Sequence, residues 1–243
     1  MFYNFIKELR NRFILLFLTW SSVVVISYLY KEILIFIFVK PSLNAFQGNS
    51  FYFIFTNLTD IFSTYLRLVY FLGNQVLFFF FFYHLFLFLA PGLYHSEYRN
   101  FARLLCLSLT FWSCSVFVLN KFLLPFSWQF FLSFQTSTTQ SVLSFYLEAK
   151  INEYINFYIN LYYICGLNFQ LFILFFIFLD HIKENLASLK IFRKFFYFSF
   201  FLIATFLTPP DVFSQVFVGF SSVLVYELTI ISIILKTNML RLS

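Results

Sequence analysis

The sequence predicts an all-α polytopic membrane protein with six transmembrane helices, both termini on the inner side of the membrane and two short helices at the end. Hydrophobic residues make up 61% of the 243 positions, and charged residues only 11%. Charge-poor segments also recur at about the 20 residues that a helix needs to cross the hydrocarbon core. A soluble domain has a smaller apolar share and more charge, so we expect residues 1–243 to form one membrane domain.

The expected spans follow the charge-poor segments. They lie at about 13–35, 65–90, 101–124, 156–179, 194–208 and 213–235. The first follows three basic residues and has no clear small-residue cleavage site, so we expect it to be retained rather than removed as a signal peptide. Lys31 and Glu32 fall near its outer end. The stretch before the second span and the stretch Pro125–Ile155 are expected to be long loops on one side.

The fifth and sixth spans are expected to be short. The uncharged run Phe195–Pro210 has 16 residues, which as a helix would rise only about 24 Å. A segment of this length either thins the bilayer locally or is sheltered by neighbouring helices, and the sequence leaves both possibilities open.

Basic residues indicate the orientation, because Lys and Arg gather on the inner side of a membrane. With six spans, eleven basic residues fall on one side and five on the other, which predicts inner termini. The eleven are Lys7, Arg10, Arg12, Arg99, Arg103, Lys183, Lys190, Arg193, Lys194, Lys236 and Arg241, and the five are Lys31, Lys40, Arg67, Lys121 and Lys150.

Two acidic residues are expected on the inner face. Glu8 precedes the first span and lies four residues before Arg12, a spacing that allows an ion pair on one helix face. Glu97 follows Pro91 and Gly92, which end the second span, and is expected to begin an inner loop. From the residues alone, this loop carboxylate would pair with Arg99 or Arg103.

Polar residues also occur within the apolar segments. Gln170 should face the protein interior or a wet cavity, because an unpaired polar group is costly in hydrocarbon. Glu227 is either a functional intramembrane carboxylate or a residue near the inner interface that pairs with a polar neighbour. His84 is expected to be packed or interfacial.

Between the last two spans, Pro209 and Pro210 cannot continue a helix, and Asp211 can cap the next one. The sequence therefore predicts a tight outer hairpin at these three residues. Cys106, Cys114 and Cys165 have no CxxC spacing and are expected to be buried free thiols. No metal site, haem site or other cofactor is expected.

Four motifs in this order resemble the TatC family of twin-arginine protein translocase subunits. They are ELRxR at Glu8–Arg12, APGLYxxE at Ala90–Glu97, GLNFQ at Gly166–Gln170 and LTPPDVFSQ at Leu207–Gln215. Tyr98 stands where the family usually has a basic residue, and Phe172 where it usually has Pro.

The resemblance implies a core and receptor subunit, not an enzyme, that exports folded proteins with twin-arginine signal peptides by means of the proton gradient. It implies that Glu8, Arg10, Glu97 and Arg99 bind the signal peptide. It also implies that Gln170 lies at a groove or partner-subunit contact, and we expect Glu227 there as well, because an intramembrane carboxylate is a functional candidate. Expected partners are single-span proteins of the TatA and TatB type, the signal peptides, the lipid bilayer and further copies or subunits, but no nucleic acid.

The large excess of Phe suggests an AT-rich organellar gene, because Phe codons are rich in T. We therefore expect a mitochondrially encoded protein of the mitochondrial inner membrane with both termini in the matrix, the alternative being a bacterial plasma membrane. An alternative function is that of a structural membrane subunit of a respiratory-chain complex without transport activity. Such a scaffold has no need of Glu8 and Glu97 near one another. A secondary transporter is disfavoured, because no inverted repeat is found.

Overall fold

The structure is a computed structural model that describes residues 2–43, 52–134, 147–181, 191–208 and 212–242. These residues are almost entirely helical, and their β-structure is limited to one isolated bridge between Ile54 and Lys150. Three described segments are long and apolar enough to cross a membrane, namely Phe5–Leu29, Leu58–Gly92 and His95–Ser133. The predicted all-α polytopic class is confirmed, whereas the number of spans and the side of the termini stay predictions.

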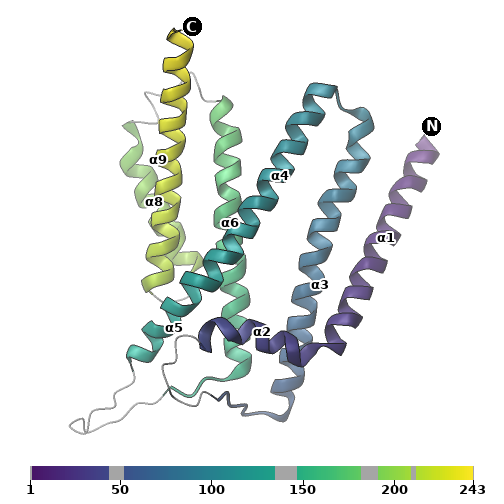
Figure 1. The fold of residues 1–243 in the computed structure, drawn as a ribbon, viewed down its shortest axis with the longest axis vertical. Coiled ribbons are helices and arrows are strands. Elements are labelled where there is room, and N and C mark those ends of the chain that lie inside the picture. Colours follow the sequence, from purple (N-terminus) through teal and green to yellow (C-terminus); the bar gives the residue numbers. More distant parts are fainter. Residues whose placement is uncertain (1, 44–51, 135–146, 182–190, 209–211, 243) are drawn as a thin grey trace. The chain divides into compact units, whose positions relative to one another are not determined.

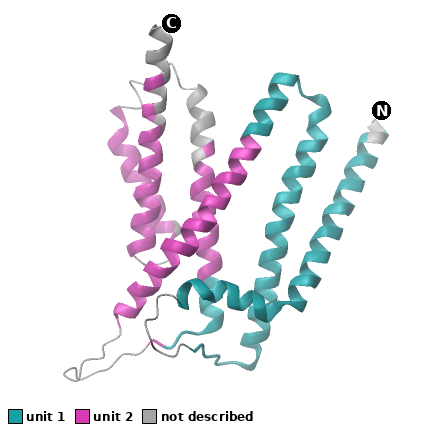
Figure 2. Ribbon diagram, viewed as in Figure 1, with its two compact units in different colours: residues 1–103, 148–156 teal, residues 104–147, 157–243 magenta. Residues whose placement is uncertain are grey.

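The chain divides into two compact units (Figure 2). Unit 1 comprises Met1–Arg103 and Glu148–Asn156, and unit 2 comprises Leu104–Leu147 and Phe157–Ser243.

Unit 1 is built on two antiparallel helices, α1 (Phe2–Leu29) and α3 (Leu58–Leu89) (Figure 1). Gly73 allows them to approach closely, because a Cβ atom there would lie 2.8 Å from Cγ2 of Val24. Beside this contact the indole N–H of Trp20 donates a hydrogen bond to Oδ1 of Asn74 (3.2 Å). The hydrogen bond between Trp20 and Asn74 and the close packing at Gly73 thus hold α1 against α3 near the middle of both helices.

A break after α1 divides the expected first span. The helix ends at Leu29, and α2 (Lys31–Leu43) leaves in a different direction (Figure 1). The expected span 13–35 therefore crosses this break. The physical reason lies in Lys31 and Glu32, since two adjacent charges are costly inside hydrocarbon. The ammonium group of Lys31 instead lies over the rings of Tyr28 and Tyr65, 4.8 and 5.0 Å from their centroids.

The opposite end of α3 leads through a short 3₁₀ turn, η1 (Ala90–Gly92), into α4 (His95–Val118). Pro91 lies in that turn, so its missing N–H costs no helical hydrogen bond. Phe86 on α3 stacks on Phe101 of α4, with ring centroids 5.5 Å apart, and also contacts the ring of Tyr98. These aromatic contacts hold the first turns of α4 against α3.

In unit 2, α4 continues through a five-residue π turn, η2 (Leu119–Leu123), into α5 (Leu124–Ser133). The expected loop Pro125–Ile155 is therefore wrong over its first part, because Pro125–Ser133 is helical. Pro125 lies at the start of α5, directly after the π turn, where the altered hydrogen-bond register can accommodate a residue without an N–H. Ser127 and Trp128 of this continuation are buried.

The other helices described in unit 2 are α6 (Ile151–His181, of which residues from Phe157 belong here), α8 (Arg193–Leu207) and α9 (Val212–Leu242). Ile164, Ala204 and Val218 bring these three helices together in a buried apolar cluster. The short fifth segment is confirmed as α8, with 15 residues.

The expectation of a short last helix is wrong, because α9 has 31 residues. Charged residues past the uncharged run do not end a helix, and basic residues near its C-terminus are favourable for the helix dipole. No proline interrupts Val212–Leu242, so the helix continues through Lys236 and Arg241.

Candidate functional site

The first candidate site residue, Glu8, is held by Arg12 on the next turn of α1. Nε of Arg12 donates a hydrogen bond to Oε1 of Glu8 (3.1 Å), and Nη2 of Arg12 binds the same oxygen. The third nitrogen, Nη1, donates to the backbone carbonyl of His84 on α3 (3.1 Å). The predicted ion pair therefore forms, and Arg12 additionally connects α1 to α3.

The second carboxylate, Glu97, caps α4. It is the third residue of that helix, and its Oε2 accepts a hydrogen bond from the backbone N–H of Tyr94 (3.0 Å), as in one half of a capping box. The expectations that Glu97 lies in a loop and pairs with Arg99 or Arg103 are both wrong. Arg103 instead donates to the carbonyl of Arg99 and to Oδ1 of Asn100. A carboxylate at this position is stabilised by the N-terminal N–H groups of the helix.

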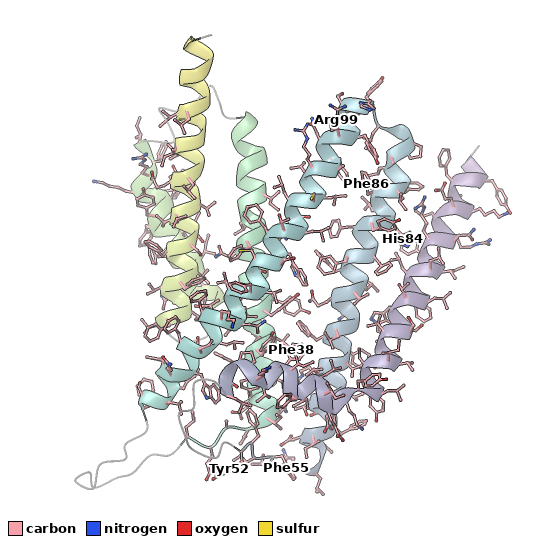
Figure 3. All side chains as sticks on the ribbon, in the orientation of Figure 1. Phe38, Tyr52, Phe55, His84, Phe86 and Arg99 are labelled. Atoms are coloured by element: carbon pink, nitrogen blue, oxygen red, sulfur yellow. The ribbon has the colours of Figure 1, made fainter. Side chains whose placement is uncertain are left out.

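The four residues predicted to bind a signal peptide all belong to unit 1. Because α1 and α3 are antiparallel, Glu8 lies beside the half of α3 that leads to Glu97. In Figure 3, His84 lies on the part of α3 that faces α1, and Arg99 lies near the start of α4. Glu8 and Glu97 each have a hydrogen-bond partner of their own and share none. The side chains of Arg10 and Arg99 are exposed.

A pocket of about 360 Å³ lies beside Arg12, between α1 and α3. Its walls are apolar and include Leu9, Phe13 and Leu16 of α1, with Leu85 and Phe88 of α3. The guanidinium of Arg12 lies 5.9 Å from the centroid of the Phe88 ring. Sequence reasoning did not identify this pocket, although its residues recur at the three- and four-residue spacing of a helix face.

Gln170 lies in unit 2, where its Nε2 donates a hydrogen bond to the carbonyl of Ser108 on α4 (3.1 Å). Sequence reasoning missed its neighbour Asn168, which is only 4% exposed. Nδ2 of Asn168 donates to the hydroxyl of Ser221 on α9, and its Oδ1 accepts from Ser222. The signal was present in the GLNFQ motif, because an amide within an apolar run needs a partner in a neighbouring helix.

Glu227 on α9 forms an ion pair with Arg193 at the start of α8, with Nη2 and Oε2 3.2 Å apart. The hydroxyl of Tyr197 also donates a hydrogen bond to this carboxylate. Of the two interpretations left open by the sequence, these contacts favour pairing with a polar neighbour.

The remaining sequence predictions concern the hairpin, the cysteines and metals. Pro209, Pro210 and Asp211 lie outside the described residues, between the end of α8 and the start of α9. The cysteines are free, but only Cys165 is buried, so the prediction of burial is wrong for Cys106 and Cys114, whose helix faces are uncovered. Among the described residues, no three His, Cys, Asp or Glu side chains gather where they could hold a metal ion.

Comparison with known proteins adds a family assignment. Residues 4–220 match the family described as Sec-independent protein translocase protein (TatC). The chain is 32% identical over 234 residues to a protein of Nephroselmis olivacea named "Uncharacterized tatC-like protein ymf16", covering 92% of this chain and 90% of the relative. It is 31% identical to the Sec-independent protein translocase protein TatC of Rickettsia prowazekii (strain Madrid E), covering 95% and 91%.

Solved structures show the same fold. A crystal structure described as the twin arginine translocase receptor TatC superposes with a TM-score of 0.67, covering 96% of this chain and 99% of the other at 24% sequence identity.

Proposed function

Because the chain belongs to the TatC family of Sec-independent protein translocase proteins, we propose that the end of unit 1 that carries Glu8 and Glu97 binds the twin-arginine signal peptides of folded cargo. Members of this family are subunits of a protein-transport machine and not enzymes.

The observation that carries the proposal is the free oxygen on each carboxylate. Glu8 accepts hydrogen bonds through Oε1, and Glu97 accepts through Oε2, so one oxygen of each carboxylate has no hydrogen-bond donor among the described residues. Both carboxylates are exposed. A guanidinium offers several N–H groups in a planar fork, so it can bind such an oxygen directionally, whereas an ammonium acts as a point charge.

Of the two carboxylates, Glu97 is the better acceptor for a cargo arginine. It accepts one backbone N–H and has no cationic partner in the described part of the chain, while Glu8 already has Arg12. The exposed side chains of Arg10 and Arg99 follow Glu8 and Glu97 by two residues each. Their positive charges repel a cationic peptide group that does not form a direct bond with one of the carboxylates. We therefore assign the main arginine contact to Glu97 and a second contact to Glu8.

The test is crosslinking of a twin-arginine peptide to variants of Glu97. Glu97→Gln keeps a side chain that can cap α4 but removes the charge, so crosslinking should fall about tenfold or more, as expected when a charge-assisted bond becomes neutral. Glu153→Gln, in another exposed acid of unit 1, is the matched control and should have no effect. A twin-lysine peptide should crosslink weakly to the unaltered protein.

Undiminished crosslinking to the Glu97→Gln variant would contradict the assignment. A loss seen only with Glu97→Ala, and not with Glu97→Gln, would mean that Glu97 acts solely as a helix cap.

The wider proposal follows from the family. The chain would act with single-span partners of the TatA and TatB type, with Gln170 and Glu227 near their contact surface, and would use the proton gradient to export folded proteins. The relatives named ymf16 include proteins of Nephroselmis olivacea, Reclinomonas americana and Arabidopsis thaliana, and the similarity to them supports our proposal of a mitochondrial inner-membrane protein. Recovery of respiratory-chain subunits instead of single-span partners, after gentle solubilisation, would favour the structural role.

A further inference from the structure

The apolar pocket between α1 and α3 has the properties of a ligand site. Its volume of about 360 Å³ falls within the range of roughly 300–1,000 Å³ that is typical of small-molecule pockets. Leu9, Phe13 and Leu16 form one wall, and Phe81, Leu85 and Phe88 form the other. Such a lining suits a hydrocarbon chain.

The segment of α1 that leads to the pocket carries a net positive charge. Residues 7–12 of α1 contain three basic side chains, Lys7, Arg10 and Arg12, against one carboxylate, Glu8, and that carboxylate is paired with Arg12. Arg10 is exposed and has no partner among the described residues. It lies three residues before Phe13, so the two are neighbours on the helix surface at the edge of the pocket.

The position of the pocket along α1 indicates its depth. Arg12 is the last charged residue before the uncharged stretch Phe13–Tyr30. Because charged side chains avoid hydrocarbon, the transition between headgroups and hydrocarbon should fall at this point. The pocket then opens where the headgroup of a lipid meets its acyl chains.

One polar atom in the pocket wall needs a partner. Nδ1 of His84 is buried and makes no hydrogen bond among the described residues. A buried unpaired polar atom is unfavourable, and its presence commonly marks a missing ligand or water.

These observations together select an amphiphile with an anionic head. A free anion would leave the apolar walls empty, and an uncharged hydrocarbon would leave Arg10 without a partner. We propose that the pocket binds one acyl chain of an anionic phospholipid, whose phosphate lies against Arg10 and the edge of Arg12. Basic pockets between transmembrane helices bind anionic lipid headgroups in this way. The inference does not depend on the proposed cargo site.

Native mass spectrometry of the full chain tests the proposal. The protein is purified in mild detergent and offered equal amounts of dioleoyl phosphatidylglycerol and dioleoyl phosphatidylcholine, which share their acyl chains and differ in charge. We expect the phosphatidylglycerol to be retained preferentially. Equal retention of the two lipids would overturn the proposal.

Two variants locate the bound lipid. Leu85→Trp fills the pocket and should reduce phosphatidylglycerol retention several-fold, whereas Leu87→Trp, on the same helix but outside the pocket, should not. Arg10→Gln changes an exposed side chain, so it should not disturb the packing of the protein. It should weaken phosphatidylglycerol retention about fivefold, which is the effect of one basic residue at an anionic surface. Lys194→Gln, an exposed basic residue of unit 2, is its control.

Retention that is unchanged in both Leu85→Trp and Arg10→Gln would place the lipid elsewhere and overturn the proposal. A photo-reactive residue introduced at Leu85 provides a second test, since it should crosslink to lipid. If it crosslinked instead to the apolar part of a signal peptide, the pocket would belong to the cargo site and the lipid proposal would be wrong.

Discussion

At the scale of single residues, the polar side chains of α6 form hydrogen bonds with neighbouring helices. Asn168 is bonded to two serines of α9, and Gln170 to a backbone carbonyl of α4. Sequence reasoning predicted that Gln170 would need a partner, but it could not name Ser108, which lies 62 residues away. It also treated Glu97 as a loop residue, because Pro91 and Gly92 indicate a helix end and carry no sign that a new helix begins three residues later, at His95.

The ion pair between Arg193 and Glu227 should stabilise the α8–α9 contact. Glu227→Gln or Arg193→Gln should each cost about 1 kcal/mol, at the upper end for a partly exposed pair. Thermal unfolding of the detergent-solubilised protein would measure this loss.

The matched control for this ion pair is Lys194→Gln, next to Arg193 on α8, which should leave the unfolding temperature unchanged. The double exchange Arg193→Glu with Glu227→Arg should recover part of the loss. If the exchange recovered nothing, attraction between the two charges would not be the cause.

At the scale of whole helices, hydrophobic patterning located the segments well but not their ends. The predicted fifth segment, 194–208, agrees with α8 at Arg193–Leu207, because basic residues and prolines bound it on either side. The ends of α1 and α5 were missed for different reasons. The turn at Tyr30 precedes the charged pair Lys31 and Glu32, which the sequence shows but which was placed inside the span, and the π turn before Pro125 depends on hydrogen-bond register, which leaves no periodic signal in the sequence.

Close packing of α8 on α9 depends on Gly219. A Cβ atom at this position would lie 2.6 Å from Cδ1 of Phe201, so Gly219→Ala should force the ring to move and cost about 1–3 kcal/mol. Chemical unfolding of the purified protein would measure the change.

Gly166→Ala is the control for this substitution, because nothing lies within 4 Å of its Cβ position, and alanine is the better helix former. It should be neutral or slightly stabilising. Combining Gly219→Ala with Phe201→Leu should relieve the clash, so the double variant should lose less stability than the two single variants together. If the two losses simply added, the clash with the Phe201 ring would not be the cause.

At the scale of the whole molecule, the order of four short motifs was more informative than any single one. ELR or a Pro-Pro pair occurs in many proteins, but all four in sequence predicted the TatC family, and the match over residues 4–220 confirms it. Composition predicted the membrane class for a simpler reason, since a chain with 61% hydrophobic residues has too few polar side chains to cover a soluble core.

Orientation is testable at this scale. Eleven basic residues against five predict that both ends of the chain lie on the same side of the membrane. Reporters that are active on one side only, fused to either end, should therefore give the same signal. A reporter inserted between Ser133 and Ile151 should give the opposite one, and unlike signals from the two ends would exclude an even number of spans.

The ion pair between Arg12 and Glu8 has a consequence for how tightly cargo is held. Under the proposed function, an arriving arginine meets a carboxylate whose charge is already shared with Arg12, so the open oxygen of Glu8 attracts it less strongly than an unpaired carboxylate would. Such a contact adds only modestly to the affinity for cargo. A receptor built in this way recognises its signal and still releases it, because the pair between Glu8 and Arg12, with Arg12 also bonded to the carbonyl of His84, is intact before and after the signal peptide leaves.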